Sequence, residues 1–157
     1  MNVKPSFWIV LAAATVVAVT AAALLTLNTS EEERVQQTLL AALDALQSRD
    51  ADTALATTTE DFSIEGVEAR DGQVRAGVQR ALDGCETIEV ESAMDDLTVR
   101  DDGTATVNVS VTTWCQSVLS GHRLALNDLP PVRGRTKFAI HLKKISDRWL
   151  IHRVTYR

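Results

Sequence analysis

Cysteine is nearly absent from this sequence, since Cys85 and Cys115 are the only two among 157 residues. The pair forms no CxxC redox motif and no zinc-type Cys/His cluster, and no cysteine near the N-terminus could carry a lipid anchor. In an oxidising compartment an even pair favours one disulfide, which would stabilise the domain by roughly 3 to 4 kcal/mol in the chain-entropy model. Two buried free thiols are the alternative.

Motifs that carry catalysis or cofactor binding are also missing. The sequence contains no glycine-rich phosphate loop, no GxSxG elbow and no HExxH helix, so it predicts no catalytic residue, no metal site and no cofactor. Aromatic residues make up only 4% of the chain, and its net charge is −5. Nucleic acid is therefore not expected as a partner.

Charge is absent from a long stretch near the N-terminus. No residue between Lys4 and Glu31 is charged, and residues 7–27 read FWIVLAAATVVAVTAAALLTL. A helix of that length would just cross a hydrocarbon core of about 30 Å. We expect residues 1–29 to form a transmembrane anchor and residues 30–157 to form one extracytoplasmic domain.

A cleaved secretory signal is the alternative to an anchor, because Lys4 precedes the run and residues 21–23 are small enough for a cleavage site. The run is longer than the roughly 7 to 15 apolar residues of such signals, which favours the anchor. Lys4 before the span and glutamates at 31–33 after it favour a cytoplasmic N-terminus. The expected location is a bacterial inner membrane, crossed once, with the C-terminal domain in the periplasm.

The first part of the domain predicts three helices. Ser30 and Glu33 form a capping box, which is a signature of a helix start. Apolar residues follow every three or four positions until about residue 49, so this helix has one face to bury. Asp50 is placed to cap a short second helix, and a third helix is predicted over 73–82.

The second part predicts antiparallel strands, because apolar residues there alternate with polar ones. The alternation changes phase between residues 92 and 96, which predicts a bulge or bend. A turn follows at 101–103, and residues 119–134 are expected to form a long connection. Residues 138–145 and 149–156 form the closing hairpin. Helices followed by antiparallel strands predict an α+β fold.

The closing hairpin carries two of the three histidines. A two-residue turn at Ser146 and Asp147 would pair His141 with His152. An unbroken period of two then assigns one face to the core and exposes the other. The exposed face is expected to contact a partner through Lys137, His141, Lys143, His152 and Tyr156. Because these histidines have cationic neighbours and no carboxylate in the pattern, they predict neither a metal site nor a general base.

Three segments stand in a familiar order and spacing: RVQQTLLAALDALQSRDADTALATTTEDFSI, DDGTATVNVSV and TKFAIHLKKISDRWLIHRV. In this arrangement residues 30–157 resemble the NTF2-like superfamily, also called SnoaL-like or cystatin-like. The resemblance implies a strongly bent antiparallel sheet packed on two or three helices, with a conical cavity between them.

Enzymes of that superfamily, such as steroid isomerases and polyketide cyclases, hold a catalytic carboxylate and hydrogen-bond donors in the cone. The resemblance implies the carboxylate near Gly66 and the isomerase tyrosine near Leu39, and neither residue type is present there. Asp61 or Glu65 could substitute, but both are interpreted as solvated charges at a strand edge. We therefore do not expect an enzyme.

Charge is distributed unevenly along the chain. Residues 28–120 contain 6 Lys and Arg against 19 Asp and Glu, a net charge of −13, whereas residues 121–157 contain 9 against 2, a net charge of +7. Cross-strand pairing explains part of this pattern, and a surface for an acidic partner or anionic lipid explains the rest.

The sequence therefore predicts a membrane-anchored extracytoplasmic binding or assembly module. Its partners would be the lipid bilayer and a protein, either in a membrane complex that it serves as accessory subunit or scaffold, or as a homo-oligomer. The alternative is a small-molecule-binding or SnoaL-like enzyme domain that uses the cavity.

Overall fold

The computed structural model describes residues 30–65, 73–125 and 136–157. The helices are α2 (Glu31–Gln47), α3 (Ala51–Ala56) and α4 (Gln73–Asp83). The strands are β1 (Thr58–Ile64), β2 (Cys85–Val99), β3 (Thr104–Ser117), β4 (Arg123–Ala125), β5 (Lys137–Ile145) and β6 (Arg148–Tyr156). The predicted span at 7–27 lies outside the described residues, and no helix within them is long and apolar enough to cross a membrane.

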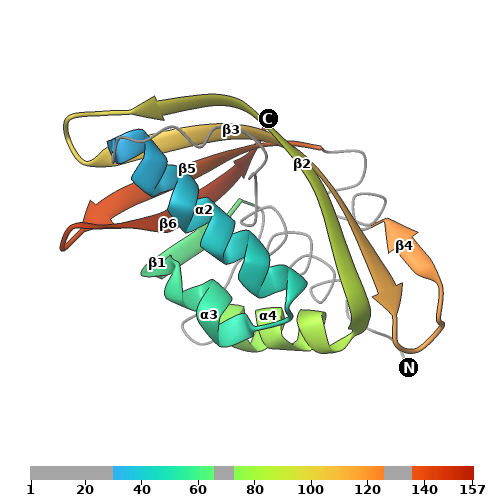
Figure 1. The fold of residues 1–157 in the computed structure, drawn as a ribbon. Helices are drawn as coiled ribbons and strands as arrows, with labels where there is room; N and C mark the ends of the chain where they lie inside the picture. Colours follow the sequence, from blue (N-terminus) through green and yellow to red (C-terminus); the bar gives the residue numbers. More distant parts are fainter. Residues whose placement is uncertain (1–29, 66–72, 126–135) are drawn as a thin grey trace.

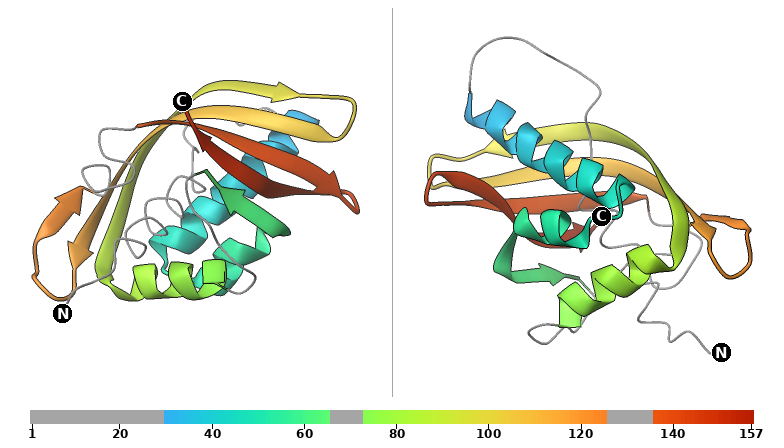
Figure 2. Two further views of the ribbon diagram at one scale, coloured as in Figure 1. Left: turned by 180° about the vertical axis from the view of Figure 1, so that it is seen from behind. Right: turned by 60° about the horizontal axis from the view of Figure 1, so that its bottom comes forward.

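The strands form one bent sheet in the order β1-β6-β5-β3-β2, with β4 paired to the end of β3. All pairs are antiparallel except β1 with β6. The long strands β2 and β3 curve over α2, while α3 and α4 lie at the far end of that helix (Figures 1 and 2). β4 falls inside the segment predicted to be only a connection.

Both helix starts follow from their capping residues. The Ser30 hydroxyl accepts a hydrogen bond from the Glu33 N–H at 3.2 Å, and the Asp50 carboxylate accepts one from the Thr53 N–H at 3.0 Å. Between these helices Arg49 adopts a φ of 59°, which reverses the chain. The predicted helices are confirmed, with α2 ending two residues before residue 49.

Strand β3 shows why one side of the sheet is apolar. Alternate residues along it are buried against the helices: Ala105, Val107, Val109, Val111, Thr113, Cys115 and Ser117. The intervening residues are mostly Thr, Ser and Asn, and they face the other side, which we call the outer face. The neighbouring β2 changes phase at a register shift between Met94 and Asp96, as predicted.

The interior contains two groups of buried residues. The larger lies between α2 and the strands β3, β5 and β6, and it includes Leu39, Val107, Phe138 and Ile151. The smaller joins the end of α2 to α3, α4 and the start of β2. Burial of apolar side chains at about 25 cal/mol per Å² makes these groups the main source of stability.

The predicted register of the closing hairpin is wrong beyond Ile151. Residues 142–145 pair with 148–151 as expected, but a bulge in β6 then shifts the register, and His141 pairs with Arg153 instead of His152. The extra residue turns the rest of β6 over. Unbroken alternation would place Val154 outside with His152, but it is only 1% exposed and belongs to the larger core. Tyr156 packs against Phe138 with ring centroids 5.8 Å apart.

We predict that Val154→Ala lowers the free energy of unfolding by roughly 1 to 3 kcal/mol, because it leaves a cavity in the larger core. Arg153→Ala, at the exposed neighbouring position, should change it by less than about 0.5 kcal/mol. Urea denaturation of both variants measures the difference. Equal effects would argue against the bulge.

Candidate functional site

A polar cluster occupies the outer face around His141. Thr106 of β3, His141 of β5 and Arg153 of β6 are directly paired across three adjacent strands. The His141 Nε2 lies 3.1 Å from the Thr155 hydroxyl, and its Nδ1 lies 3.4 Å from that of Thr106. The imidazole is therefore held between two hydroxyl groups.

Burial is the main cause that lowers the pKa of His141, and the positive charges of Arg153, His152 and Arg100 lower it further. A protonated imidazole at this position would lose water and face three cationic or titratable neighbours. The neutral form of His141 is therefore favoured.

His152 occupies the bulge and contacts β1. Its Nδ1 lies 3.3 Å from a carboxylate oxygen of Asp61 and 3.4 Å from the Thr59 hydroxyl. The hydrogen bond from Thr59 is the largest cause that lowers the pKa of Asp61, and His152 and Lys143 add to it. The expectation that no carboxylate lies beside the histidines is wrong, because β1 runs parallel to β6 and brings Asp61 alongside.

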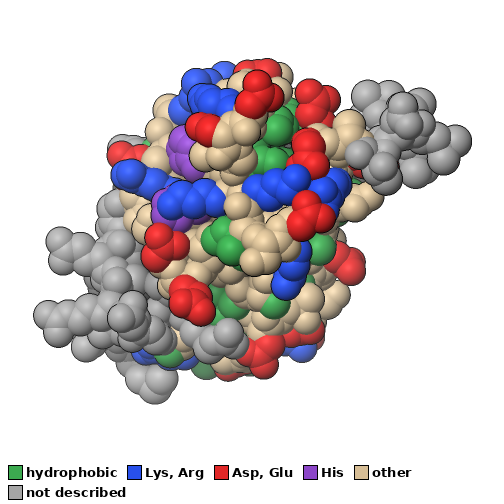
Figure 3. Space-filling model, turned by 90° about the vertical axis from the view of Figure 1, so that its left-hand side faces the viewer, with side chains coloured by type: hydrophobic (Ala, Val, Ile, Leu, Met, Phe, Trp, Pro, Cys, Tyr) green, Lys and Arg blue, Asp and Glu red, His purple; other side chains and the backbone are tan. Residues whose placement is uncertain are grey.

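The five residues predicted to face a partner do not share one side of the sheet. The pairing of β5 with β3 places Lys137, His141 and Lys143 on the outer face, opposite Ser110, Thr106 and Thr104. Tyr156 belongs instead to the inner side, beside the core. Histidine side chains lie among Lys and Arg side chains on the surface shown in Figure 3.

Opposite charge collects on β2, at the other edge of the same face. Its exposed acidic residues there are Glu89, Glu91, Asp95 and Asp96. The neutral outer side chains of β3 separate them from β5, and Ser110 donates a hydrogen bond to Asp95 at 2.9 Å. The outer face is thus divided into an acidic edge and a basic half.

A second polar group, which we call the α2 joint, links the start of α2 to the β5–β6 turn. One Glu31 oxygen accepts hydrogen bonds from Lys144 at 2.9 Å and Arg34 at 3.0 Å, and the other accepts one from the Trp149 indole at 2.8 Å. Arg34 also binds the Asp147 carboxylate at 3.1 Å. Hydrogen bonds from Lys144 to Glu31 and from Arg34 to Asp147 are the largest causes that lower the pKa values of these carboxyl groups.

A hollow of about 280 Å³ lies next to the α2 joint. Its lining comes from α2, Thr57 and the turn and start of β6: Arg34, Gln37, Thr38, Ala41, Thr57, Asp147, Arg148, Trp149 and Leu150. This volume is just under the 300 to 1,000 Å³ of ordinary ligand pockets. The hollow lies between α2 and the start of β6.

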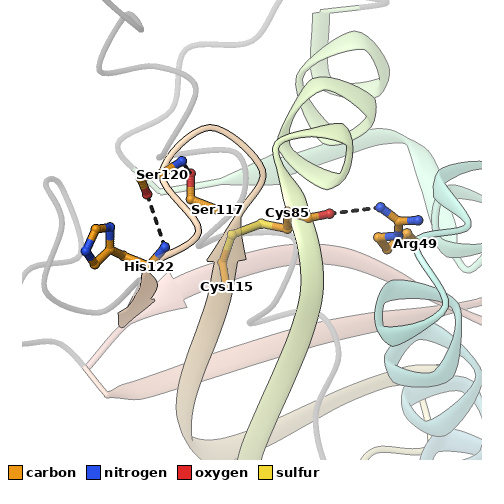
Figure 4. The surroundings of a disulfide bond; sticks show 6 residues. All are labelled: Arg49, Cys85, Cys115, Ser117, Ser120 and His122. Carbon is orange, nitrogen blue, oxygen red and sulfur yellow. Dashed lines mark hydrogen bonds between the residues drawn. A yellow bond between two sulfur atoms is a disulfide. The ribbon is translucent and has the colours of Figure 1, made fainter.

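The predicted disulfide between Cys85 and Cys115 is confirmed, with an S–S distance of 2.03 Å and both residues fully buried. It joins the start of β2 to the end of β3 (Figure 4). The Arg49 guanidinium donates a hydrogen bond to the Cys85 carbonyl at 2.9 Å, which ties the α2–α3 turn to the same place.

The residues considered for isomerase chemistry are buried in the core, contact other residues, or lie outside the described residues. Leu39 is fully buried in the core, and Gly66 lies outside the described residues. Asp61 contacts His152, while a Glu65 oxygen accepts a hydrogen bond from the Tyr156 N–H at 2.8 Å. Across 30–65, 73–125 and 136–157, no group of three or more His, Cys, Asp or Glu could hold a metal ion.

Sequence reasoning missed Arg100 and Arg153, which both act on His141. Unbroken alternation along β6 would place Arg153 on the core side and bury its guanidinium. Arg100 follows directly after β2 and was not assigned to a face. The α2 joint was also missed, because its members come from ends of the chain that only the fold brings together.

Comparison with known proteins supports the fold. No protein-family model and no curated protein matches the sequence. A ketosteroid isomerase-like protein from Erwinia carotovora atroseptica has a TM-score of 0.59 at 15% identity, covering 82% of this chain and 96% of that one. A cystatin-like domain from Nostoc punctiforme gives 0.61 at 15% identity, with 83% and 78% covered.

An NTF2-like protein from Shewanella oneidensis has a TM-score of 0.52 at 14% identity, covering 79% of this chain and 96% of that one. Identities this low establish the fold alone. The domain therefore has the α+β architecture of the NTF2-like proteins, as the sequence resemblance implied.

We predict that the α2 joint makes stability fall in acid. The pKa values of Glu31 and Asp147 are below their ordinary values of 4.5 and 3.8, so their contribution is present above those values and is lost as pH falls through the lower folded-state pKa values. Between about pH 5 and pH 3 the melting temperature of the wild type should therefore fall more steeply than that of a Glu31→Gln/Asp147→Asn variant.

The control for this comparison is Glu32→Gln, an exposed change in the same first turn of α2. Its melting temperature should depend on pH as that of the wild type does. The other carboxyl groups with lowered pKa values are present in all three proteins and therefore do not affect the comparison. If the melting temperatures of the wild type and the double variant fall equally with pH, the assignment to the α2 joint is contradicted.

We also predict that Cys85→Ser/Cys115→Ser lowers the free energy of unfolding by roughly 3 to 4 kcal/mol, given a sequence separation of 30 residues. Urea denaturation without reductant measures the loss. Reductant should lower the free energy of unfolding of the wild type by a similar amount and leave that of the variant unchanged. A variant as stable as the oxidised wild type would refute this contribution.

Proposed function

We propose that this protein is a membrane-anchored extracytoplasmic binding module, and that the basic half of its outer sheet face docks an acidic partner protein. The observation that carries the proposal is a set of cations that form no ion pair among the described residues. Lys137, Lys143 and Arg153 lie on adjacent strands, and none forms an ion pair with another residue in the described parts of the chain.

Internal pairing accounts for only part of the charge asymmetry. The acidic residues of β2 are separated from β5 by the neutral outer residues of β3. Among the described residues, the ion pair between β2 and the C-terminal segment is that of Glu89 with Arg123 at the far end. The cations near His141 therefore remain available to an acidic surface, which would steer association and fix its orientation.

Two features support the proposed location. The apolar run at 7–27 has the length of a membrane span, and the Cys85–Cys115 disulfide is of a kind that persists in oxidising compartments. An anchor would confine the domain near partners in the same membrane and so raise their effective concentration. This arrangement suits an accessory subunit of a membrane complex.

We predict that Lys137→Glu/Lys143→Glu removes the partner from the complex. Each substitution replaces attraction by repulsion on the docking face, so the association should weaken at least about tenfold. The measurement is native mass spectrometry of the tagged full-length protein, extracted gently from its own membrane, with the partner identified in the wild-type sample.

The control is Arg80→Glu/Arg123→Glu, which changes net charge equally at two exposed positions on α4 and on β4, away from the basic half. It should retain the partner. Equal recovery with both variants, equal loss with both, or a lone monomer in the wild-type sample would each overturn the proposal.

A further inference from the structure

The outer face around His141 concentrates hydrogen-bond donors and positive charge in a small area. Thr106, His141 and Arg153 form one rung across three strands, and such directly paired residues have Cβ atoms about 4.5 to 5.5 Å apart. Lys143 is two residues from His141 on the same face. The bulge places His152 beside Arg153 on the outer face, where a regular strand would place only one residue.

The groups that face His141 come from every strand around it. Arg153 and His152 lie on β6, Lys143 lies on β5, and Arg100 follows β2. Two carboxylates lie at the margins of this group: Asp61 on β1 contacts His152 and is influenced by Lys143, and Asp102 in the β2–β3 turn is influenced by Arg100. Neither is in an ion pair with Arg153 or Lys143 among the residues that the structure describes.

We propose that this cluster, defined by Arg100, His141, Lys143 and Arg153, is a binding site for a phosphate-class oxyanion. A phosphate presents several acceptor oxygens and up to two negative charges, which match the guanidinium, ammonium and hydroxyl donors gathered here. The site extends beyond the proposed docking function, because it needs no partner protein. The phosphate is either free in solution or part of a lipid head group.

Anion binding at this site is coupled to protonation of His141. In the free protein the cations beside the imidazole disfavour its charged form. An oxyanion held by Arg153 and Lys143 brings negative charge beside the imidazole and offsets that repulsion. By linkage, phosphate then raises the pKa of His141, and protonated His141 binds phosphate more tightly.

Histidine NMR tests this coupling directly, because the chain has only three histidines. The full-length protein, labelled in its histidine rings and held in uncharged detergent micelles, is titrated with pH in sodium chloride and in sodium phosphate of equal ionic strength. Phosphate should raise the His141 midpoint by about 0.5 unit or more, which corresponds to roughly threefold tighter binding to the protonated form. His122, on the β3–β4 connection, is the internal reference.

Matched variants assign the effect to the cluster. Arg153→Gln and Arg100→Gln should each reduce the phosphate-dependent shift to less than half, whereas Arg153→Lys should retain most of it. Arg123→Gln, at the far end of the sheet, should leave it unchanged. The proposal is overturned if the His141 shift is no larger than that of His122, or if Arg153→Gln and Arg123→Gln behave alike.

The source of the phosphate is distinguished by replacing micelles with lipid nanodiscs. If nanodiscs containing phosphatidic acid shift His141 without added phosphate, and nanodiscs of phosphatidylcholine do not, the ligand is a lipid head group. If only inorganic phosphate shifts it, the ligand is soluble. These titrations leave Lys137 and Lys143 intact and contain no partner protein, so their failure is separate from failure of the docking proposal.

Discussion

The bulge in β6 is the constraint on which both sides of the sheet depend. Before it, Trp149 and Ile151 point into the core, and after it Val154 does so. Without the extra residue, alternation would bury the Arg153 guanidinium and expose Val154, which costs free energy twice. The same displacement leaves His152 and Arg153 together on the outer face. One inserted residue therefore completes the core and concentrates positive charge on the opposite side.

The two core groups stabilise different parts of this arrangement. The larger one fixes α2 against β3, β5 and β6, so the outer residues of those strands keep a defined spacing. The smaller one contains the Cys85–Cys115 disulfide and receives the Arg49 hydrogen bond, which hold the start of β2 to the end of β3. The polar cluster near His141 lies over the larger group. Its geometry thus rests on packed strands rather than on loops, which favours a preorganised binding surface.

Short-range sequence patterns predicted most of the fold. The main error, in the register of β6, arose because that register depends on which residues are buried in the folded protein. The caps at Ser30 and Asp50 depend on adjacent residues, and the phase change in β2 is visible in its alternation, so both could be read directly. In the sequence, the only sign of the β6 bulge is that strict alternation would bury the charged Arg153 side chain and expose the apolar Val154 side chain. Asp61 joined His152 through a parallel pairing of β1 with β6, and no pattern within either strand encodes that neighbour.

In the proposed membrane arrangement, the α2 joint lies where the anchor enters the domain. Only two residues separate the predicted span, ending at Leu27, from the Ser30 cap, while Glu31 and Arg34 bind the β5–β6 turn through Lys144 and Asp147. The end of the sheet that carries this turn would therefore be held close to the bilayer. His141 lies four residues before Ile145 along β5, about 13 Å at 3.3 Å per residue, so phosphate head groups would be within reach of the basic half. In that arrangement the far end of the sheet, with its disulfide, would be directed away from the membrane.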